Sequence, residues 1–374
     1  MMKTVRDIPI LKGIPILVRA TLNVPVEKGK VVDTFRLRRA LPTIEFLRAK
    51  KARSILISHI TGTGTETFEP MWEAMRQWIP DLSFCPVSTG PAARAAARAL
   101  SPGGVLMLEN LRRDRGEETN RREFAAELAS LADVFVEDSF DACHREHASI
   151  VSVPKLLPSY AGLLVEEEVR ELSRALKPAS PSLAIVGGSK FETKKAVLSK
   201  LLTIYDHVFV GGAVGNDFLA AAGNPVGKSL VSGADPKTVH GLLESERLLT
   251  PVDVVVSSVR GRRTTRSDDV RSDEAILDNG PETVSLLQNF IGKAKTILWN
   301  GPIGNYEDGY AEGTEEIARA IAGSTAYSIV GGGDTVAAIE TLGLNDRFSF
   351  MSTGGGAMLE FLAKGTLPGI RVLG

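Results

Sequence analysis

The amino-acid sequence predicts an α/β fold with two doubly wound parallel sheets of the Rossmann type, joined by a hinge helix. Three observations support this prediction. The chain has 374 residues, which is too long for one ordinary hydrophobic core. Short apolar runs alternate with helix-like stretches in each half, as in parallel sheets covered by helices on both faces. A long amphipathic stretch that ends in a proline-rich segment separates the two halves.

Composition narrows the class of protein further. The net charge of −1, from 44 basic and 45 acidic residues, argues against a nucleic-acid or anionic-membrane surface but leaves room for a local basic pocket. Two cysteines are too few for a disulfide framework and suit a reducing compartment. No apolar run reaches the length of a membrane span, and the N-terminus has no apolar signal region. We therefore expect a cytoplasmic protein without nucleic-acid or membrane partners.

Five apolar runs of strand type follow one another in the first half. These runs cover residues 15–19, 54–58, 82–86, 105–109 and 133–137, and helix-like stretches at 36–50, 90–100 and 121–132 lie between them. In a parallel sheet, functional side chains lie just after the C-terminal ends of the strands. The polar residues found there, or in equivalent loops, are Arg19, Asn23, Arg36, Ser58, His59, Asn110, Arg112, Asp138 and Arg145.

Arginines at these positions predict a small anionic substrate, because the guanidinium fork matches carboxylate and phosphate groups. A single arginine of this kind is more simply explained as a solvated surface charge. Four of them, Arg19, Arg36, Arg112 and Arg145, weaken that explanation. His59 fits either a satisfied loop histidine or a member of the same pocket.

Residues 159–176 form the amphipathic stretch between the halves and are expected to be one long helix, stopped by Lys-Pro-Ala-Ser-Pro-Ser. A composition break beside a long helix is a candidate domain boundary. The predicted organisation has four parts. They are an N-terminal domain over 1–160, an interdomain helix over 161–176, a C-terminal domain over 177–360 and a tail over 361–374 that returns to the N-terminal domain.

The second half is expected to form another parallel sheet with a glycine-rich rim. Expected strands lie at 183–186, 207–210, 251–256 and 296–300, several of them ending in Gly-Gly or Asn-Gly, and residues 257–275 are expected to be an exposed excursion. Two strand–glycine–helix units follow, with glycines at 331–333 and 354–356. Glycine lets a ligand approach the backbone, and the free N–H groups of a helix start attract phosphate. One such unit is weak support, but two in succession indicate a phosphate site.

Lysines and a near-match to a known phosphate loop complete the second half. Lys190 follows Gly-Gly-Ser, and Lys194 comes four residues later, so a helix there would place both lysines on one face. Residues 222–229 nearly match the phosphate loop G-x-x-x-x-G-K-[ST]. They have alanine in place of its first glycine and follow a helix-like stretch rather than a strand. We therefore do not interpret this segment as a phosphate site.

With these motifs in order, the sequence resembles phosphoglycerate kinases over almost its entire length. The matching stretches include Asn23-Val-Pro, Ser58-His59, Leu108-Glu-Asn-Leu-Arg112, His144-Arg145, Gly187-Gly-Ser-Lys190, Trp299-Asn-Gly-Pro302, Gly331-Gly-Gly-Asp-Thr335 and Ser352-Thr-Gly-Gly-Gly-Ala357. The resemblance implies an acid-binding N-terminal lobe and a Mg-nucleotide-binding C-terminal lobe that close about a hinge. It also implies a monomeric glycolytic kinase, which transfers a phosphoryl group between 1,3-bisphosphoglycerate and ADP to give 3-phosphoglycerate and ATP, or the reverse.

The resemblance further implies a role for each matching residue. Catalytic roles fall to Arg36, Lys190 and the backbone of Gly354, Gly355 and Gly356. Nucleotide binding falls to Lys190, Lys194, Gly211, Gly212, Asn300, Glu307, Gly331, Gly332, Gly333, Asp334 and Thr335, with Asp334 also holding Mg2+. Binding of the acid falls to Arg19, Thr21, Asn23, Arg36, His59, Arg112 and Arg145. Such a set suits phosphoryl transfer, which needs alignment and charge neutralisation rather than covalent help from the protein.

Three departures from the family pattern all fall in the acid-binding half. The motif Arg-x-Asp-x-Asn has Thr21 in place of its aspartate, which in the family helps to hold the hydroxyl group of the acid. Ser-His-Leu-Gly-Arg-Pro has Gly62 in place of its phosphate-gripping arginine, and Asp141 replaces a loop glycine. Two alternatives therefore stay open. One is a kinase for a different small phosphorylated or phosphonylated acid, and the other is a non-enzymatic nucleotide-binding descendant.

Overall fold

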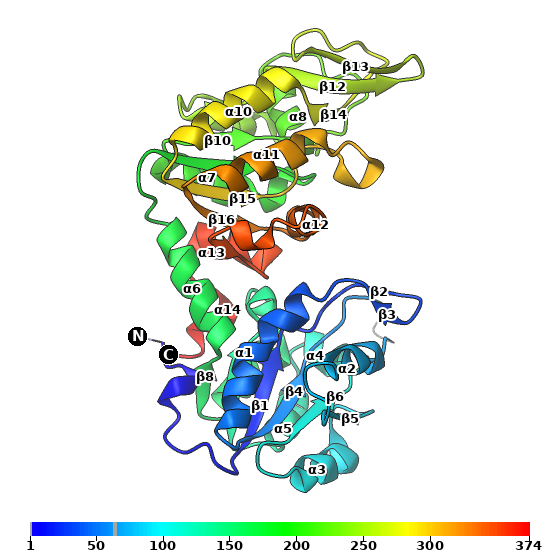
Figure 1. Cartoon of the computed structure of the whole chain (residues 1–374), viewed down its shortest axis with the longest axis vertical. Helices are drawn as coiled ribbons and strands as arrows, with labels where there is room; N and C mark the ends of the chain where they lie inside the picture. Colours follow the sequence, from blue (N-terminus) through cyan, green and yellow to red (C-terminus); the bar gives the residue numbers. More distant parts are fainter. Residues whose placement is uncertain (1, 63–65) are drawn as a thin grey trace. The chain divides into compact units, whose positions relative to one another are not determined.

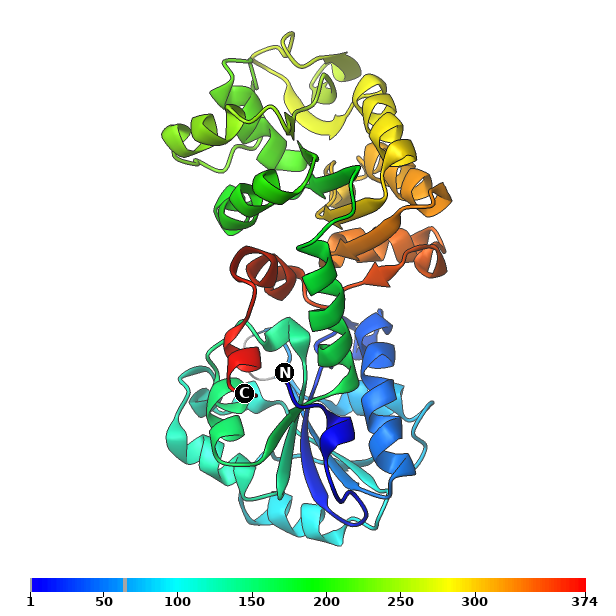
Figure 2. The same ribbon diagram turned by 90° about the vertical axis from the view of Figure 1, so that its left-hand side faces the viewer.

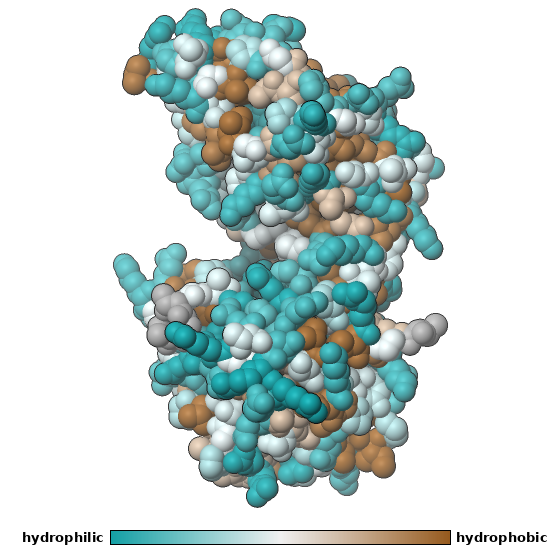
Figure 3. All heavy atoms as spheres, turned by 180° about the vertical axis from the view of Figure 1, so that it is seen from behind, coloured by the Kyte–Doolittle hydropathy of each residue, from teal (hydrophilic) through white to brown (hydrophobic). Residues whose placement is uncertain are grey.

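The computed structural model describes residues 2–62 and 66–374 and divides into two compact units (Figure 1). The first unit comprises Met1–Arg170 and Thr366–Gly374, and the second comprises Glu171–Gly365. Within the described residues, no helix has the length and apolar character needed to cross a membrane. On the face shown in Figure 3, hydrophobic side chains stand in small groups among hydrophilic ones, as on an ordinary water-exposed surface.

A parallel sheet in the order β5-β6-β4-β1-β7-β8 forms the centre of the first unit. Its strands are β1 (Pro15–Ala20), β4 (Arg53–Ile57), β5 (Ser83–Cys85), β6 (Val105–Leu108), β7 (Val134–Asp138) and β8 (Ser159–Ala161). The helices are α1 (Phe35–Ala49), α2 (Glu69–Met75), α3 (Gly90–Ala99), α4 (Arg115–Glu118) and α5 (Arg122–Ala129). A short antiparallel pair, β2 (Val26–Glu27) and β3 (Lys30–Val31), stands apart from the sheet.

Strand β1 shows why this sheet is covered on both faces. Ile16 and Val18 belong to one hydrophobic core together with Leu47 of α1. Leu17, between them, belongs to a second core together with Phe124 of α5. Successive side chains of a strand point to opposite faces, so an uninterrupted apolar run serves both layers of helices. This arrangement confirms the doubly wound fold predicted for the first half.

The expected helix over 159–176 is wrong at its beginning. Residues Ser159–Ala161 form β8, which pairs in parallel with β7, and α6 covers Leu163–Ala175. Gly162 lies between the two elements, where a Cβ atom would come 2.0 Å from Asp138 Oδ1. That oxygen accepts hydrogen bonds from the backbone N–H groups of Leu164 (3.0 Å) and Val165 (3.4 Å). The sheet edge and this capping carboxylate therefore decide where the helix starts.

The second unit contains a parallel sheet in the order β11-β10-β9-β15-β16-β17, which also confirms the predicted fold class. Its strands are β9 (Ser182–Val186), β10 (His207–Val210), β11 (Leu248–Leu249), β15 (Thr296–Asn300), β16 (Tyr327–Gly331) and β17 (Phe350–Met351). Its helices are α7 (Lys195–Ile204), α8 (Gly212–Ala221), α9 (Pro236–Leu243), α10 (Pro281–Lys293), α11 (Glu312–Gly323), α12 (Gly333–Thr341) and α13 (Gly355–Lys364).

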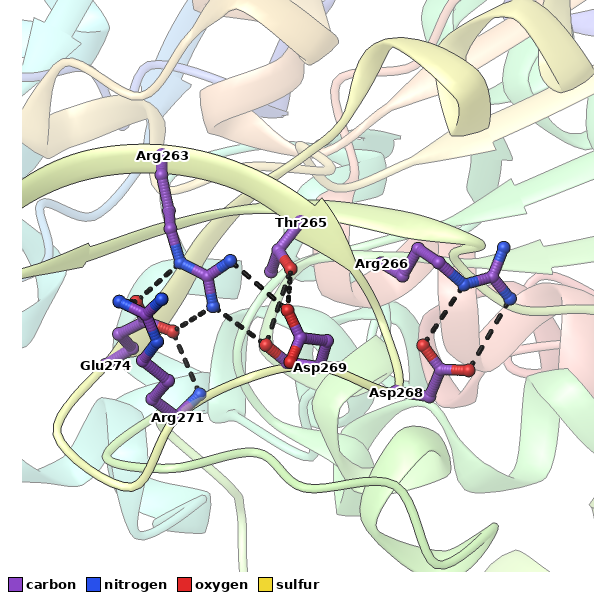
Figure 4. A network of polar contacts seen from close by, with 7 residues as sticks. All are labelled: Arg263, Thr265, Arg266, Asp268, Asp269, Arg271 and Glu274. Atoms are coloured by element: carbon purple, nitrogen blue, oxygen red, sulfur yellow. Dashed lines mark hydrogen bonds and ion pairs between the residues drawn. The ribbon is translucent and has the colours of Figure 1, made fainter.

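The region 251–279 differs from expectation. Strand β12 (Asp253–Ser258) is not part of the parallel sheet but the centre of a small antiparallel sheet. Its neighbours are β13 (Gly261–Arg266), inside the expected excursion, and β14 (Ala275–Asn279). The polar composition of β13 suits a strand with mostly exposed side chains. Arg263 pairs with Glu274 (2.7 Å) and Asp269 (3.3 Å) and thereby ties β13 to the segment before β14 (Figure 4).

The C-terminal residues rejoin the first unit (Figure 2). Helix α14 (Pro368–Arg371) carries Gly369, whose backbone N–H donates to the carbonyl oxygen of Cys143 at 2.8 Å. A Cβ atom on Gly369 would lie 2.9 Å from the side chain of Ile150. Val372 packs against Ile150 in a small hydrophobic cluster. The tail therefore supports the loop that carries His144 and Arg145.

Candidate active site

The C-terminal rim of the second sheet carries a pocket. Its walls come from the turn after β9, the start of α8, the end of β14, the turn after β15 and the start of α12. Leu230, Pro251 and Ile276 supply an apolar wall. Glu307 and Asp334 bring carboxylates to the same pocket. Apolar surface with a few polar groups is the usual lining of a small-molecule site.

Glycines are required in the two central turns of this rim. A Cβ atom on Gly187 would lie 2.1 Å from the carbonyl oxygen of Pro302, and one on Gly301 would lie 2.5 Å from the carbonyl oxygen of Gly187. Gly301 also has a φ of +92°, which L side chains rarely adopt. The turns after β9 and β15 thus touch through their backbones, and the pocket wall that they form depends on this contact.

The two triple-glycine turns lie side by side. The Cβ position of Gly355 is 3.5 Å from Gly332 Cα and 3.9 Å from the backbone nitrogen of Gly333. Helices α12 and α13 begin at these turns, so their N-termini converge at the rim. Helix N-termini carry unsatisfied N–H groups and partial positive charge. The convergence gives the rim an electropositive backbone surface that suits a phosphate chain.

The sequence suggested that Lys190 and Lys194 lie on one face of a helix, but they do not. They flank a single 3-10 turn, η6 (Phe191–Thr193), and α7 starts only after it. A Cβ atom added to Gly188, which lines the pocket, would lie 3.3 Å from Lys194 Nζ. Burial lowers the pKa of Lys194, Asp334 opposes that shift, and Lys190 adds to it. Lys194 therefore lies within electrostatic range of Lys190 and of the exposed carboxylate of Asp334, which lines the pocket.

Other predicted nucleotide residues lie behind the pocket surface. The hydroxyl group of Thr335 accepts the Gly301 N–H at 3.0 Å, and its side chain is buried. The Asn300 amide faces Met358 Sδ at 3.6 Å. Gly211 packs against Phe209 and Ile303, whereas Gly212 lines the pocket. The buried side chains of Thr335 and Asn300 thus contact neighbouring segments of the rim, and Gly212 borders the pocket with its backbone.

In the first unit, Arg19 is fully buried at the rim of the sheet. Its Nε donates to Ser149 Oγ (3.0 Å), its Nη1 donates to Ser58 Oγ (3.1 Å), and its Nη2 donates to His59 Nδ1 (2.7 Å). The N–H groups of the guanidinium thus donate hydrogen bonds to groups of the protein itself. Rather than facing solvent, Arg19 orients His59 in this structure.

Arg19, Arg112 and Arg145, which act on His59 and His147, form a strongly basic patch. Burial lowers the pKa of His59 well below its usual value, and the nearby charges of Arg19 and Arg112 lower it further. The same causes, burial first and then Arg112 and Arg145, lower the pKa of His147 to about 4. Both imidazoles are therefore neutral at pH 7. Beyond burial, the arginine charges lower both pKa values, which indicates a positive field suited to an anion.

The start of the loop after β4 differs from the family pattern. Asn23 Oδ1 accepts the Thr61 N–H (3.0 Å), and the Asn23 carbonyl oxygen accepts from Arg36 Nη1 (2.8 Å). A Cβ atom on Gly62 would lie 2.2 Å from the Glu66 carboxylate, so that side chain fills the space beside Gly62. Thr21 is buried, and its hydroxyl group has no hydrogen-bond partner among the described residues. Within loop 60–70, residues 63–65 lie outside the described residues.

Sequence reasoning missed two groups of polar residues. Asp278 and Asn279, at the end of β14, line the nucleotide-side pocket, and burial raises the pKa of Asp278 to about 6. Their signal was their position at the C-terminal end of β14, a strand that was not predicted from the sequence. Buried Glu117 accepts hydrogen bonds from the Ser149 hydroxyl (2.6 Å) and N–H (3.0 Å), and burial raises its pKa. No strand ends there, and the sequence pattern did not single out Glu117.

Comparison with known proteins gives a consistent result. The family model described as phosphoglycerate kinase matches residues 5–365. The phosphoglycerate kinase of Thermomicrobium roseum is 43% identical, covering 100% of this chain and 99% of that protein. The phosphoglycerate kinase of Thermus thermophilus is also 43% identical, with 100% of both chains covered. The crystal structure of phosphoglycerate kinase from Pyrococcus horikoshii has a TM-score of 0.91 and 30% identity, covering 100% of this chain and 98% of that chain.

Proposed function

The chain belongs to the phosphoglycerate kinase family, and from this premise we propose a reaction and a role for each part of its rim. The chain is a phosphotransferase that acts on a carboxyl group and uses ATP or ADP as co-substrate. Its acceptor acid is 3-phosphoglycerate, and the acyl phosphate is 1,3-bisphosphoglycerate. We further propose that it works as a cytoplasmic monomer.

The observation that carries the assignment is the convergence of the α12 and α13 N-termini beside Lys194 and Asp334. Phosphoryl transfer spreads negative charge over three equatorial oxygens. Backbone N–H groups and lysines fixed before the substrate arrives stabilise that charge without reorganisation. The proposed phosphate site therefore extends from Lys190 and Lys194 to Gly354–Gly356, with the ribose at Glu307 and the base on the apolar wall.

The chemical step needs no general base. A carboxylate oxygen of the acid attacks the γ-phosphorus of ATP, and the bond from that phosphorus to the bridging oxygen breaks. The bond pair leaves with ADP, so that an acyl phosphate forms and no proton is transferred. In the opposite direction, ADP attacks the acyl phosphate. The residues of the rim only align the reacting groups and neutralise the phosphate charge, as for other phosphoryl transfers.

Asp334 fits a magnesium site that the nucleotide completes. Mg2+ bound with a nucleotide usually takes one or two carboxylates, phosphate oxygens and water. Among residues 2–62 and 66–374, no group of three His, Cys, Asp or Glu side chains could hold a metal alone. Asp334 is exposed and lines the pocket, and its charge acts on Lys194. We assign Mg2+ to Asp334, where the ion would neutralise phosphate charge.

In the first unit, we assign the acid to the basic patch. Arg112 and Arg145 would bind its phosphate, and His59, held neutral, would donate a hydrogen bond. We assign Arg36 to neutralise charge in the transition state. Arg19 and Asn23 support these groups through His59 and Thr61.

The alternative of a different acid keeps one specific observation in its favour. Glu66 fills the space beside Gly62, where the family places an arginine. A carboxylate there weakens the hold on a phosphate ester, which raises the expected KM for 3-phosphoglycerate. An acid with a different spacer or a phosphonate group is the second candidate.

A coupled assay of ATP consumption over a panel of small carboxylic acids, with and without phosphate or phosphonate groups, tests the proposal. We expect the highest kcat/KM with 3-phosphoglycerate. A higher value with another acid would select the alternative. Calorimetry with Mg-ADP tests the nucleotide half separately, and unmeasurable binding at millimolar concentration would refute it. Nucleotide binding without turnover of any acid would indicate a non-enzymatic descendant.

A further inference from the structure

We propose that Asp141 is a specificity-determining residue whose carboxylate binds the hydroxyl group of the acceptor acid. The inference rests on the proposed function of the first unit. It explains two departures, at positions 21 and 141, as one change in which a carboxylate moved from one strand end to its neighbour.

The sheet places both positions at the same rim. Strands β1 and β7 pair in parallel, with Ala20 opposite Asp138. The next residues along these two chains are Thr21 and Ser139. Asp141 Oδ1 accepts a hydrogen bond from Ser139 Oγ at 2.7 Å, so its carboxylate is tied to the end of β7. Thr21 and the Asp141 carboxylate therefore belong to adjacent strand ends.

A single hydroxyl group connects Asp141 to the acid site. Ser139 Oγ accepts from Arg19 Nη1 at 3.4 Å, and Arg19 Nη2 donates to His59. The chain of contacts runs from the carboxylate through Ser139 and Arg19 to the neutral histidine. Asp141 thus lies at the edge of the basic patch rather than on a distant surface.

A carboxylate beside a patch that binds anions reduces their affinity unless it makes a contact with the ligand. Among the described residues, Asp141 has one hydrogen bond, at Oδ1, which leaves Oδ2 for a donor. An ionised carboxylate only accepts hydrogen bonds. Of the polar groups of 3-phosphoglycerate, only the hydroxyl group is a donor when both acidic groups are ionised. The geometry therefore pairs Asp141 with that hydroxyl group.

Thr21 makes the exchange possible. Its side chain is buried and neutral, and its hydroxyl group lacks a partner among the described residues. With aspartate at both positions, two carboxylates would compete at adjacent strand ends, and each would repel the substrate. One carboxylate at this rim is sufficient to orient one hydroxyl group.

The test compares 3-phosphoglycerate with the analogue that lacks its hydroxyl group, 3-phosphonooxypropanoate, in the full-length parent and in Asp141→Asn. We expect the substitution to lower kcat/KM for 3-phosphoglycerate by about 10- to 100-fold, as for loss of a charged hydrogen bond. The value for the analogue should change less than about threefold on the same scale. Asp133→Asn, an exposed aspartate just before the same strand, is the matched control and should change neither value.

Equal losses with both acids would show that Asp141 only orients Arg19 and would overturn the inference, as would no loss at all. A parent that uses both acids equally would overturn the inference alone. A parent that uses neither acid would refute the proposed function as well, so the two failures are distinguishable.

A second variant guards against misfolding of Asp141→Asn. Thr21→Asp combined with Asp141→Gly returns the carboxylate to the other strand end. We expect it to recover the preference for 3-phosphoglycerate over the analogue to within about fivefold of the parent, and Thr21→Asp alone to raise KM for both acids. A double variant that folds, as judged by its Tm, but shows no preference would contradict the relocation.

Discussion

The two units present their ligand groups in different ways. The rim of the second unit is made of backbone, since its turns touch at Gly187 and Gly301 and its helices start at glycines. The rim of the first unit is made of side chains, with Arg19 buried among hydroxyl groups and His59. A backbone site changes only by altering the path of the chain. A side-chain site changes one residue at a time, and the three departures from the family pattern all lie there.

The largest loss of nucleotide affinity should come from adding one methyl group to the backbone site. Gly301→Ala places a Cβ atom 2.5 Å from the Gly187 carbonyl oxygen at a φ of +92°, so the turn must move. We expect a loss of about 3 kcal/mol of stability or more and at least a tenfold weaker nucleotide affinity, by thermal unfolding and calorimetry. The control is Gly292→Ala in α10, where nothing lies within 4 Å of the added atom. An unchanged Tm and affinity for Gly301→Ala would contradict the backbone description.

Arg36→Ala should affect transfer and leave nucleotide binding intact. Its proposed contribution is to the transition state, so kcat should fall at least about 100-fold, or 2.7 kcal/mol of barrier. The affinity for Mg-ADP in calorimetry should be unchanged, because Arg36 belongs to the first unit. Arg38→Ala, two residues later on α1, is the matched comparison. A kcat for Arg36→Ala within about threefold of the parent, roughly 0.7 kcal/mol, would show the role to be wrong.

Asp138 should make the stability of the first unit depend on pH. Burial raises its pKa to about 7 in the folded protein. The unfolded chain therefore loses this proton first, and the contribution to stability falls between about pH 4 and pH 7, by up to about 4 kcal/mol. Asp138→Asn keeps an oxygen for the α6 N–H groups and removes the titration. Its Tm relative to the parent should thus rise from pH 5 to pH 8, whereas a constant difference would exclude this effect.

The smallest effect should come from restoring the charge at position 62. Gly62→Arg must displace the Glu66 carboxylate or pair with it, and the flexible side chain can move. This substitution alone should lower KM for 3-phosphoglycerate by only about threefold to tenfold, because Glu66 remains beside the new charge. Steady-state kinetics measure this change. A parent with a micromolar KM for 3-phosphoglycerate and no better alternative acid would show that the departures do not weaken its use of this acid.

The sequence predicted the layers of the fold better than it predicted the site. Apolar runs such as Ile16–Val18 specify a strand buried on both faces, and that information is local. The role of Arg19 as a ligand stays a prediction, whereas its burial and its hydrogen bond to Ser149, 130 residues away, could not be predicted from local sequence. The start of α6 was misplaced because Asp138 and the sheet edge, not the helical pattern, determine it. The strand β13 was missed because an exposed strand of polar residues lacks an apolar alternation.

The return of the chain to the first unit has a consequence for biosynthesis. Most of the first unit is made before the second unit, but the segment that covers Cys143 and Ile150 is made after it. The second unit ends at Gly365 and can complete its core while the acid-binding loop still lacks its support. A nascent or C-terminally clipped chain would therefore hold nucleotide before it can hold the acid. Acid binding in the first unit would then depend on the segment Thr366–Gly374.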